Sequence, residues 1–328
     1  MLKALPIEIQ ASIFDVMNDL WKLRSDDSVI PESWFHRWIC TVPKSYIKQI
    51  RLISLYEVLR KIWTSIITAR ISKVWTSLKV LHPTQYGYQF SMGTDTELIQ
   101  VINVVEDAAE FKKRLILTSF DTTKAFDSVN KPLMVAAWER LGVPPDIADY
   151  LVNIDVGGDT LIKTPHAKSV IAQLQKGQCL RDVKVSDEKA KSTANTVRTF
   201  EARDGIGQGD SPSANAWIAI YDILLCALDE IEEEPYRFLK RDGEVSSCTA
   251  AAYADDLQTF SPTVAHAQAA IEIVSAFNCV TGFTTNVKKM HCGTNLSGDF
   301  GTVQVYDKLW QAHPLKIEPE MEVELRLT

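Results

Sequence analysis

The sequence predicts an α+β fold in which an antiparallel sheet packs on helices. Three observations support this class. Apolar residues recur at helical spacing in several segments, beginning in the first twenty-odd residues. Residues 115–120 form a short apolar run that is typical of a buried strand. Residues 248–253 and 257–260 flank an Asp-Asp pair in the pattern of a β-hairpin, and the order helix, strand, helix, helix, hairpin, helix implies an antiparallel sheet.

Each expected helix has its own signal. The first carries an apolar stripe at Ile13, Phe14, Met17, Leu20 and Trp21. The second is long, and its stripe is expected at Leu55, Val58, Leu59, Ile62, Ile66, Ile71, Val74 and Trp75. Further helices are expected over residues 133–141, 215–228 and 264–278. Ser261 and Pro262 form a favourable N-cap and first-turn pair for the last of these, which stops near Gly282.

The composition is that of a globular intracellular protein. Hydrophobic residues make up 46% and charged residues 23% of the 328 residues. The most apolar stretch, residues 216–228, is interrupted by Asp222 and falls short of the roughly 18 residues that a membrane span needs. The N-terminus lacks the apolar segment of a signal peptide. We therefore expect no membrane partner.

The cysteines indicate the cellular compartment, and the charges bear on the kind of binding partner. The six cysteines never fall at C-x-x-C spacing, and scattered single cysteines fit a reducing compartment. The formal net charge is −7, which alone disfavours a nucleic-acid partner. However, residues 1–80 hold 12 Lys/Arg against 7 Asp/Glu, so the negative excess lies in the rest of the chain. A basic N-terminal lobe is suited to a phosphate backbone, and an acidic body is suited to cations.

The hairpin and the apolar run each carry carboxylates at the end of an apolar strand, where a bound cation would offset their negative charge. Asp255 and Asp256 occupy the hairpin tip, and Asp121 closes the apolar run, with Asp127 six residues later. Taken alone, the Asp-Asp pair is equally compatible with an ordinary exposed turn. Strand-end carboxylates on neighbouring strands are, however, the arrangement that divalent ions require.

The chemistry of these acids favours Mg²⁺, with Mn²⁺ as a substitute. Mg²⁺ takes oxygen ligands, and two such ions about 3.5–4 Å apart activate a 3′-hydroxyl and stabilise a leaving pyrophosphate. We expect Asp121 and Asp255 to bridge the two ions and Asp256 to be an accessory ligand. No His or Cys lies near these acids in the sequence, which argues against zinc or non-haem iron.

Three motifs carry a family resemblance. Residues 120–129, FDTTKAFDSV, resemble the first palm motif of reverse transcriptases from non-LTR retrotransposons and group II introns. The tetrad YADD at 253–256 is similar to their catalytic hairpin, and GIGQGDSPS at 205–213 is similar to their glycine-glutamine-glycine loop. Flanking segments extend the resemblance over residues 31–292, including QYGY at 85–88 and GFTTNVKK at 282–289. The resemblance implies a right-hand polymerase made of fingers and palm.

The resemblance also implies roles for residues. It assigns metal binding to Asp121, Asp255 and Asp256, in agreement with the local chemistry. Phe126 would lie beneath the incoming sugar and exclude a 2′-hydroxyl, so that deoxynucleotides are favoured. Without the resemblance, Phe126 is more simply read as a core residue.

Four further contacts to nucleotide and one to pyrophosphate are implied. Lys44 and Arg51 would hold the triphosphate, as a point charge and a bidentate fork respectively. Gln208 and Gly209 would approach the nucleotide and template. Lys289, with Lys288 as an alternative, would position or protonate the leaving pyrophosphate.

The sequence departs from the family in several places, which puts efficient chemistry in doubt. Leu52 stands where the family has proline, Gln89 stands where it has arginine, and Ser211-Pro212-Ser213-Ala214 shifts the usual prolines. We expect N-terminal helices and fingers over residues 1–114, a palm over 115–292 with an insertion at 157–204, and an extension or start of a thumb over 293–328. A full thumb and an endonuclease are expected to be missing from the chain.

The resemblance implies an RNA-directed DNA polymerase that extends a DNA primer on an RNA template with deoxynucleotides. Two alternatives stay open. One is a palm-type RNA-dependent RNA polymerase. The other is an inactive or domesticated palm domain that binds RNA or protein. The resemblance favours the nucleus over the cytoplasm as the site of action.

Overall fold

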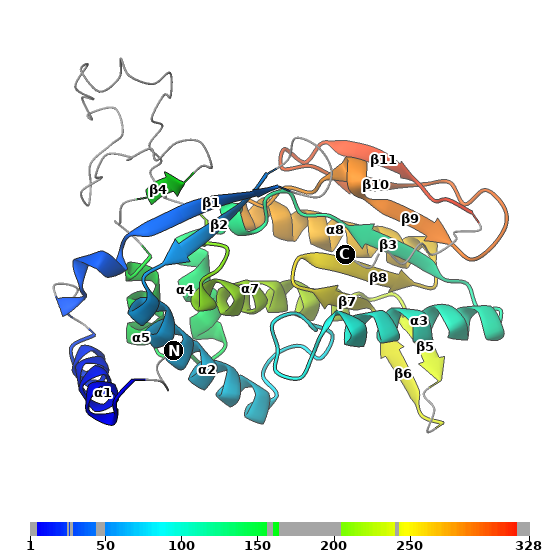
Figure 1. The fold of residues 1–328 in the computed structure, drawn as a ribbon. Coiled ribbons are helices and arrows are strands. Elements are labelled where there is room, and N and C mark those ends of the chain that lie inside the picture. The colour runs from blue at the N-terminus through cyan, green and yellow to red at the C-terminus, as the bar shows by residue number, and fades with distance from the viewer. Residues whose placement is uncertain are drawn as a thin grey trace, which may run out of the picture. The chain divides into compact units, whose positions relative to one another are not determined.

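The computed structural model describes residues 5–24, 26, 29–43, 50–155, 160–163, 205–239 and 243–319 (Figure 1). The chain divides into two compact units. Unit 1 comprises Met1–Ile71 and Met134–Ala214, and unit 2 comprises Ser72–Leu133 and Asn215–Thr328. The expected insertion at 157–204 lies outside the described residues except for one short strand. The predicted three-part division of the chain stays a prediction.

Unit 1 combines helices with a small mixed sheet. Its sheet has the order β2-β1-β4, in which β1 pairs antiparallel with β2 and parallel with β4. The elements that lie in this unit, or begin or end in it, are α1 (Ile7–Lys22), η3 (Glu32–Trp34), β1 (Arg37–Pro43), β2 (Ile50–Tyr56), α2 (Val58–Leu78), α4 (Lys131–Arg140), α5 (Pro145–Asn153) and β4 (Thr160–Lys163).

The long helix α2 differs from the sequence prediction. Leu55 belongs to β2, and the helix begins only at Val58. Several residues of the expected apolar stripe are exposed, namely Val58, Leu59 and Val74, whereas Arg60, Trp63, Thr64, Ile67, Thr68 and Trp75 are buried. The predicted stripe was therefore wrong at Leu55, Val58, Leu59 and Val74, whereas Trp75 is buried as predicted and Ile62, Ile66 and Ile71 are half-buried. A hydrophobicity pattern misses this buried face because Arg60 and the threonines are buried with hydrogen-bond partners.

Unit 2 is built around a larger sheet. Its elements are α3 (Thr94–Glu110), β3 (Ile116–Phe120), η4 (Phe126–Ser128), most of α7 (Ser211–Asp229), β5 (Tyr236–Leu239), β6 (Val245–Cys248), β7 (Ala250–Tyr253), β8 (Asp256–Ser261), α8 (Val264–Thr281), η6 (Val287–Lys289), β9 (His291–Thr294), β10 (Thr302–Tyr306) and β11 (Ala312–Lys316). The strand over 115–120 and the hairpin at 248–260 are confirmed as β3 and as β7 with β8.

The main sheet has the order β7-β8-β3-β9, and every neighbouring pair is antiparallel. Helix α3 packs against β7, and α8 packs against β8 and β3 (Figure 1). Leu117 of β3 and Leu115, just before the strand, join a core cluster with Val101 and Val104 of α3. The predicted α+β class, with an antiparallel sheet packed on helices, is confirmed.

The last predicted helix, α8, has a different N-cap from the one expected. Ser261 is the last residue of β8, and the N-cap of α8 is Thr263, whose side chain accepts a hydrogen bond from His266 N. The Ser261–Pro262 prediction was therefore wrong, because the strand continues through Ser261. Helix α8 ends as predicted at Gly282, which has a φ of 80°.

Helix α7 is longer than the apolar stretch 216–228. Within the described residues it is the helix that is long and apolar enough to cross a membrane, but most of its length is buried in the protein. Burial of this kind favours a core helix. The five described cysteines, Cys40, Cys226, Cys248, Cys279 and Cys292, are free thiols.

Candidate active site

Asp121 lies at the end of a central strand of the unit 2 sheet. The strand β3 ends at Phe120, which pairs with Leu257 of β8. Because the strands are antiparallel, continuing this register by one residue brings Asp121 opposite Asp256. Strand pairing thus brings two carboxylates that are far apart in sequence to one edge of the sheet.

Asp255 and Asp256 follow from a tight turn between β7 and β8. Tyr253 pairs with Asp256, so Ala254 and Asp255 form a two-residue loop. Of these two, Ala254 has a positive φ, 57°. A positive φ at the first loop residue alone is the signature of a type II′ hairpin turn. The turn directs two consecutive carboxylates to the same edge as Asp121.

These acids also influence one another electrostatically. Partial desolvation and the negative charges of Asp255 and Asp121 raise the pKa of Asp256 to about 6, against the opposing effect of Lys289. Within unit 2, a concentration of negative charge is therefore only partly balanced by this lysine.

Lys289 is brought to the carboxylates by the segment that follows α8. Thr123 N donates to Thr284 O and Asn286 N donates to Asp121 O, each at 2.8 Å. The next turn, η6, carries Lys289, whose Nζ lies 3.2 Å from Oδ1 of Asp121. The lysine side chain is 57% exposed, so its ammonium is free to rotate into solvent.

The donor set suits a hard divalent cation. The clustered groups are all carboxylates, and Oε1 of nearby Glu97 is buried without a hydrogen-bond partner. Burial, and secondarily the charge of Asp256, raises the pKa of Glu97 to about 7. In the described part of the chain no three His, Cys, Asp or Glu side chains converge closely enough to hold a metal ion. The carboxylates therefore fit Mg²⁺ by ligand type. Their described side chains are not close enough together to hold one ion jointly, and Asp121 is paired with Lys289.

Tyr221 of α7 connects the two carboxylate-bearing loops, and the sequence analysis missed it. Its hydroxyl donates to Asp255 O at 3.3 Å and is also hydrogen-bonded to the side chain of Thr122. The ring is 2% exposed and stacks on Trp217. Its spacing in an apolar helix resembles that of any core aromatic residue, so no sequence signal distinguishes it.

Phe126 follows Asp121 in a short 3-10 turn and lies among aromatic rings. It stacks on Trp217 with ring centroids 5.3 Å apart and an interplanar angle of 16°. Tyr88 meets its edge at 6.3 Å. Trp217 in turn contacts Phe283 at 5.3 Å. The Phe126 ring is therefore backed by a rigid stack and is itself half-buried.

Gln208 and Gly209 lie in unit 1, in the loop before α7. This loop rests on β2, because Ser54 N donates to Gln208 O at 2.8 Å. A Cβ at Gly207 would lie 1.8 Å from the hydroxyl oxygen of Tyr56. A Cβ at Gly209, whose φ is 119°, would lie 2.7 Å from Ser54 O. Both glycines are thus required for the close approach of the loop to the strand.

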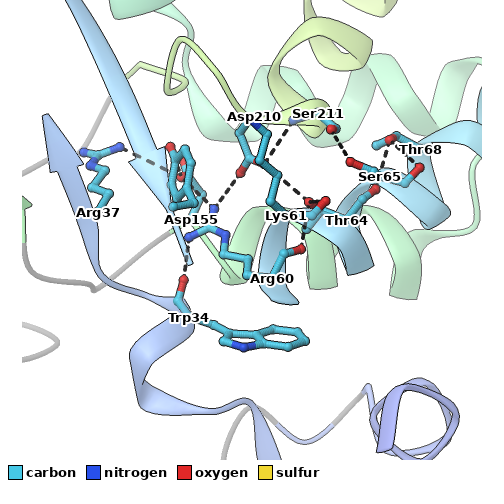
Figure 2. A network of polar contacts seen from close by, with 11 residues as sticks. Trp34, Arg37, Arg60, Lys61, Thr64, Ser65, Thr68, Asp155, Asp210 and Ser211 are labelled. Atoms are coloured by element: carbon cyan, nitrogen blue, oxygen red, sulfur yellow. Dashed lines mark hydrogen bonds and ion pairs between the residues drawn. The ribbon is translucent and has the colours of Figure 1, made fainter. Parts of the chain in front are cut away.

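A buried polar network holds the end of the same loop (Figure 2). Asp210 accepts a hydrogen bond from Ser211 N at 3.0 Å at the start of α7. Its carboxylate also pairs with Arg60, which donates to Trp34 O at 2.6 Å and lies 3.3 Å from Asp155. In the sequence, Arg60 is only one of the basic residues of the N-terminal lobe, and no pattern marks it for this role.

The remaining residues predicted to contact the nucleotide are Lys44, Arg51, Gln208 and Gly209. Lys44 lies outside the described residues. Arg51 belongs to β2, where it pairs with Val42. Gln208 is half-buried and Gly209 exposed within unit 1. The roles of these residues in nucleotide binding stay predictions.

Comparisons with known proteins give the family and the fold of the chain. The chain is 24% identical over 216 residues to the retrovirus-related Pol polyprotein from type-1 retrotransposable element R2 of Popillia japonica. That match covers 64% of the chain and 25% of the relative, so the chain spans about a quarter of the length of that polyprotein.

Two solved structures are similar in fold. Apo telomerase from Candida tropicalis, truncated from its C-terminal domain, has a TM-score of 0.53 at 11% identity, covering 87% of this chain and 56% of that one. Candida tropicalis telomerase in complex with a TWJ fragment of telomeric RNA gives 0.53 at 11% identity, covering 90% and 48%. At this identity the likeness shows the fold alone, which is the predicted right-hand polymerase fold. The reverse transcriptase (RNA-dependent DNA polymerase) family matches residues 42–316, and the chain therefore belongs to this family.

Proposed function

We propose that the chain is the polymerase domain of a retrotransposon reverse transcriptase. It would transfer nucleotides from deoxynucleoside triphosphates to the 3′-hydroxyl of a DNA primer paired with an RNA template. The observation that supports this proposal most directly is the gathering of Asp121, Asp255 and Asp256 at one sheet edge. Membership of the reverse transcriptase family makes this chemistry the expected one.

In this proposal each predicted site residue has a separate role in the reaction. Asp121, Asp255 and Asp256 would hold two Mg²⁺ ions, or Mn²⁺ as a substitute, which when bound lower the pKa of the attacking hydroxyl and neutralise the phosphates. Lys289 would leave Asp121 and donate to the departing pyrophosphate. Phe126 would exclude a 2′-hydroxyl from the sugar site.

The unit 1 residues would handle the nucleotide and template. Lys44 and Arg51 would contact the triphosphate, and Gln208 and Gly209 would line the path of the nucleotide and template. The RNA template, the DNA primer and an intracellular, nuclear location all belong to this proposal. The free cysteines are compatible with a reducing compartment.

A second candidate is a palm domain that binds RNA without catalysis. The pairing of Lys289 with Asp121 favours this binding module, because one oxygen of a proposed metal ligand is already bound to the lysine. A third candidate is an RNA-dependent RNA polymerase. The following experiment distinguishes the three candidates.

The test is primer extension on an RNA template with Mg²⁺, run with deoxynucleotides and with ribonucleotides. Asp255→Asn removes a proposed ligand, and Glu106→Gln removes an exposed carboxylate of α3 as a matched control. We expect DNA product from the wild type and from Glu106→Gln, and none from Asp255→Asn. RNA product would instead establish an RNA polymerase. RNA binding without extension by folded protein would favour the binding module.

A further inference from the structure

The segment between α2 and α3 runs alongside the catalytic hairpin. Gln85 and Ala252 form a parallel β-bridge. Tyr86 N donates to Ala252 O at 2.7 Å, and Ala252 N donates to Thr84 O at 2.9 Å. These bonds attach the segment to β7, two residues before the turn that carries Asp255 (Figure 1). The position of this backbone therefore depends on the hairpin, and the hairpin depends on it.

The side chain of Gln85 reaches the turn itself. Its Oε1 accepts two backbone hydrogen bonds, from Gly87 N at 2.8 Å and from Ala254 N at 3.2 Å. The residue is completely buried, and both hydrogen bonds lie in the protein interior. Gln89 Nε2 in turn donates to the main-chain oxygen of Gln85. One amide oxygen thus fixes two donors, one of them in the first residue of the turn.

The turn needs such support for three reasons. Ala254 has a φ of 57°, a backbone conformation that residues other than glycine rarely adopt. Glycine is the usual residue at this position of a type II′ turn. The residue is also 5% exposed, so its N–H would be a buried unpaired donor without Gln85. In addition, the adjacent charges of Asp255 and Asp256 repel each other.

Gly87 permits the close approach of this segment. A Cβ at Gly87 would lie 2.3 Å from Ala254 N and 2.9 Å from Ala254 Cα. Both neighbours are backbone atoms that move only if the hairpin moves. A side chain at Gly87 would therefore displace the turn.

We infer that Gln85 is a positioning residue for Asp255 and Asp256, acting through the N–H of Ala254. This inference rests on the proposed polymerase function for its effect on activity. The structural role of Gln85 does not depend on that function, because its side-chain oxygen holds the turn whether or not the chain is active. Gln85→Met keeps the length of the side chain and removes the acceptor. Gln85→Glu keeps a carbonyl acceptor at the same place, because complete burial favours the neutral, protonated form of a carboxyl there.

The first measurement is amide hydrogen exchange of the full chain without metal, because it does not require activity. Gln85→Met is expected to speed exchange at residues 253–256 about tenfold or more, while the β5–β6 hairpin exchanges as in the wild type. Gln85→Glu is expected to restore most of the protection. Unchanged exchange at 253–256 in Gln85→Met would overturn the inference.

The second measurement is primer extension. In an active chain, Gln85→Met is expected to lower kcat roughly tenfold to a hundredfold with KM for deoxynucleotide changed less than about threefold, since a misplaced ligand affects the reaction more than binding. Gln85→Glu is expected to recover most of kcat. Full activity in Gln85→Met would overturn the inference. An inactive wild type would count against the proposed function, and hydrogen exchange would still decide the role of Gln85.

A variant at Gly87 covers the case in which Gln85→Met does not fold. Gly87→Ala is expected to speed exchange at 253–256, because its Cβ meets Ala254. Gly93→Ala is the matched control, since its φ is −144° and its Cβ meets the end of the flexible Asp95 side chain. Equal exchange at 253–256 in the two glycine variants would overturn the inference.

Discussion

Arg60 and Asp210 form an ion pair in the interior of unit 1, with Nη2 of Arg60 2.7 Å from Oδ2 of Asp210 and both side chains at most 3% exposed. Asp210 directly follows Gly209 and caps the start of α7. Burial raises the pKa of Asp210, the charge of Arg60 lowers it, and the net direction is upward. The pair therefore fixes the end of the glycine-rich loop at a considerable desolvation cost, for which the additional hydrogen bonds compensate.

Replacing Arg60 by methionine is expected to destabilise the protein by about 3–5 kcal/mol, because Asp210 is left as an uncompensated buried charge. The measurement is urea denaturation followed by circular dichroism. Asp210→Asn is expected to be milder, since Arg60 keeps Asp155 and the amide still accepts from Ser211 N. In the double variant the two losses should not add. Simple additivity would show that the pair contributes no coupling.

This network shows where sequence reasoning reaches its limit. The strand before Asp121 and the hairpin around Asp255 were predictable, because apolar runs of strand length end in residues that have no place in a core. The face that α2 buries was not predictable from hydrophobicity. It carries Arg60 and Thr64, whose burial depends on Asp210, about 150 positions away in the chain.

The same limit applies to the site. The carboxylates stand out because consecutive aspartates are unusual at the end of an apolar strand. Gln85 and Tyr221 do not stand out, because a glutamine near a turn and a tyrosine in an apolar helix are common. Their roles come from single hydrogen bonds to Ala254 N and Asp255 O, which only the three-dimensional register creates. The helix α3 was also missed, although its apolar residues Val101 and Val104 recur at helical spacing.

A pH-dependent contribution to stability is expected from Asp107 of α3. Burial would raise the pKa of Asp107, but hydrogen bonds from Lys113, Tyr236 and Leu239 N outweigh it and lower the pKa below its usual value. A carboxyl with a lowered folded pKa stabilises the protein above its unfolded pKa and loses this effect as the pH falls through the folded pKa. Asp107→Asn is therefore expected to cost roughly 1–3 kcal/mol at pH 7.

The difference between wild type and Asp107→Asn should shrink as the pH falls below about 4. The measurement is the free energy of unfolding of both proteins in urea at several pH values from 7 down to 3. A difference that is constant over this range would show that the charge of Asp107 is not the stabilising feature.

Sugar selectivity is expected to depend on the stack of Phe126 on Trp217. If Phe126 excludes a 2′-hydroxyl, Phe126→Val should raise the ratio of ribonucleotide to deoxynucleotide incorporation by about tenfold to a hundredfold. Trp217→Phe should raise it less, because a smaller ring supports Phe126 less firmly. The ratio is measured by single-nucleotide extension. An unchanged ratio in Phe126→Val would remove the proposed role of this ring.

The last prediction separates a local effect of Tyr221 on the carboxylates from its contribution to stability. Tyr221→Phe removes the hydroxyl that donates to Asp255 O at 3.3 Å and that is also bonded to Thr122. We expect kcat for primer extension to fall about threefold to tenfold, with a loss of roughly 1 kcal/mol in stability. Tyr236→Phe is the matched control, because Tyr236 is also a buried tyrosine and its hydroxyl has Asp107 as partner, 2.7 Å away.

Tyr236→Phe should lose at least as much stability as Tyr221→Phe, since its partner is a carboxylate and such bonds are worth about 1.5–3 kcal/mol. The kcat of Tyr236→Phe should nevertheless stay within about twofold of the wild type, because Asp107 is a buried residue of α3 and not part of the hairpin. If both variants lose activity in proportion to stability, Tyr221 acts only through folding. If kcat falls in Tyr221→Phe alone, the bond to Asp255 O helps to hold the carboxylate in its working position.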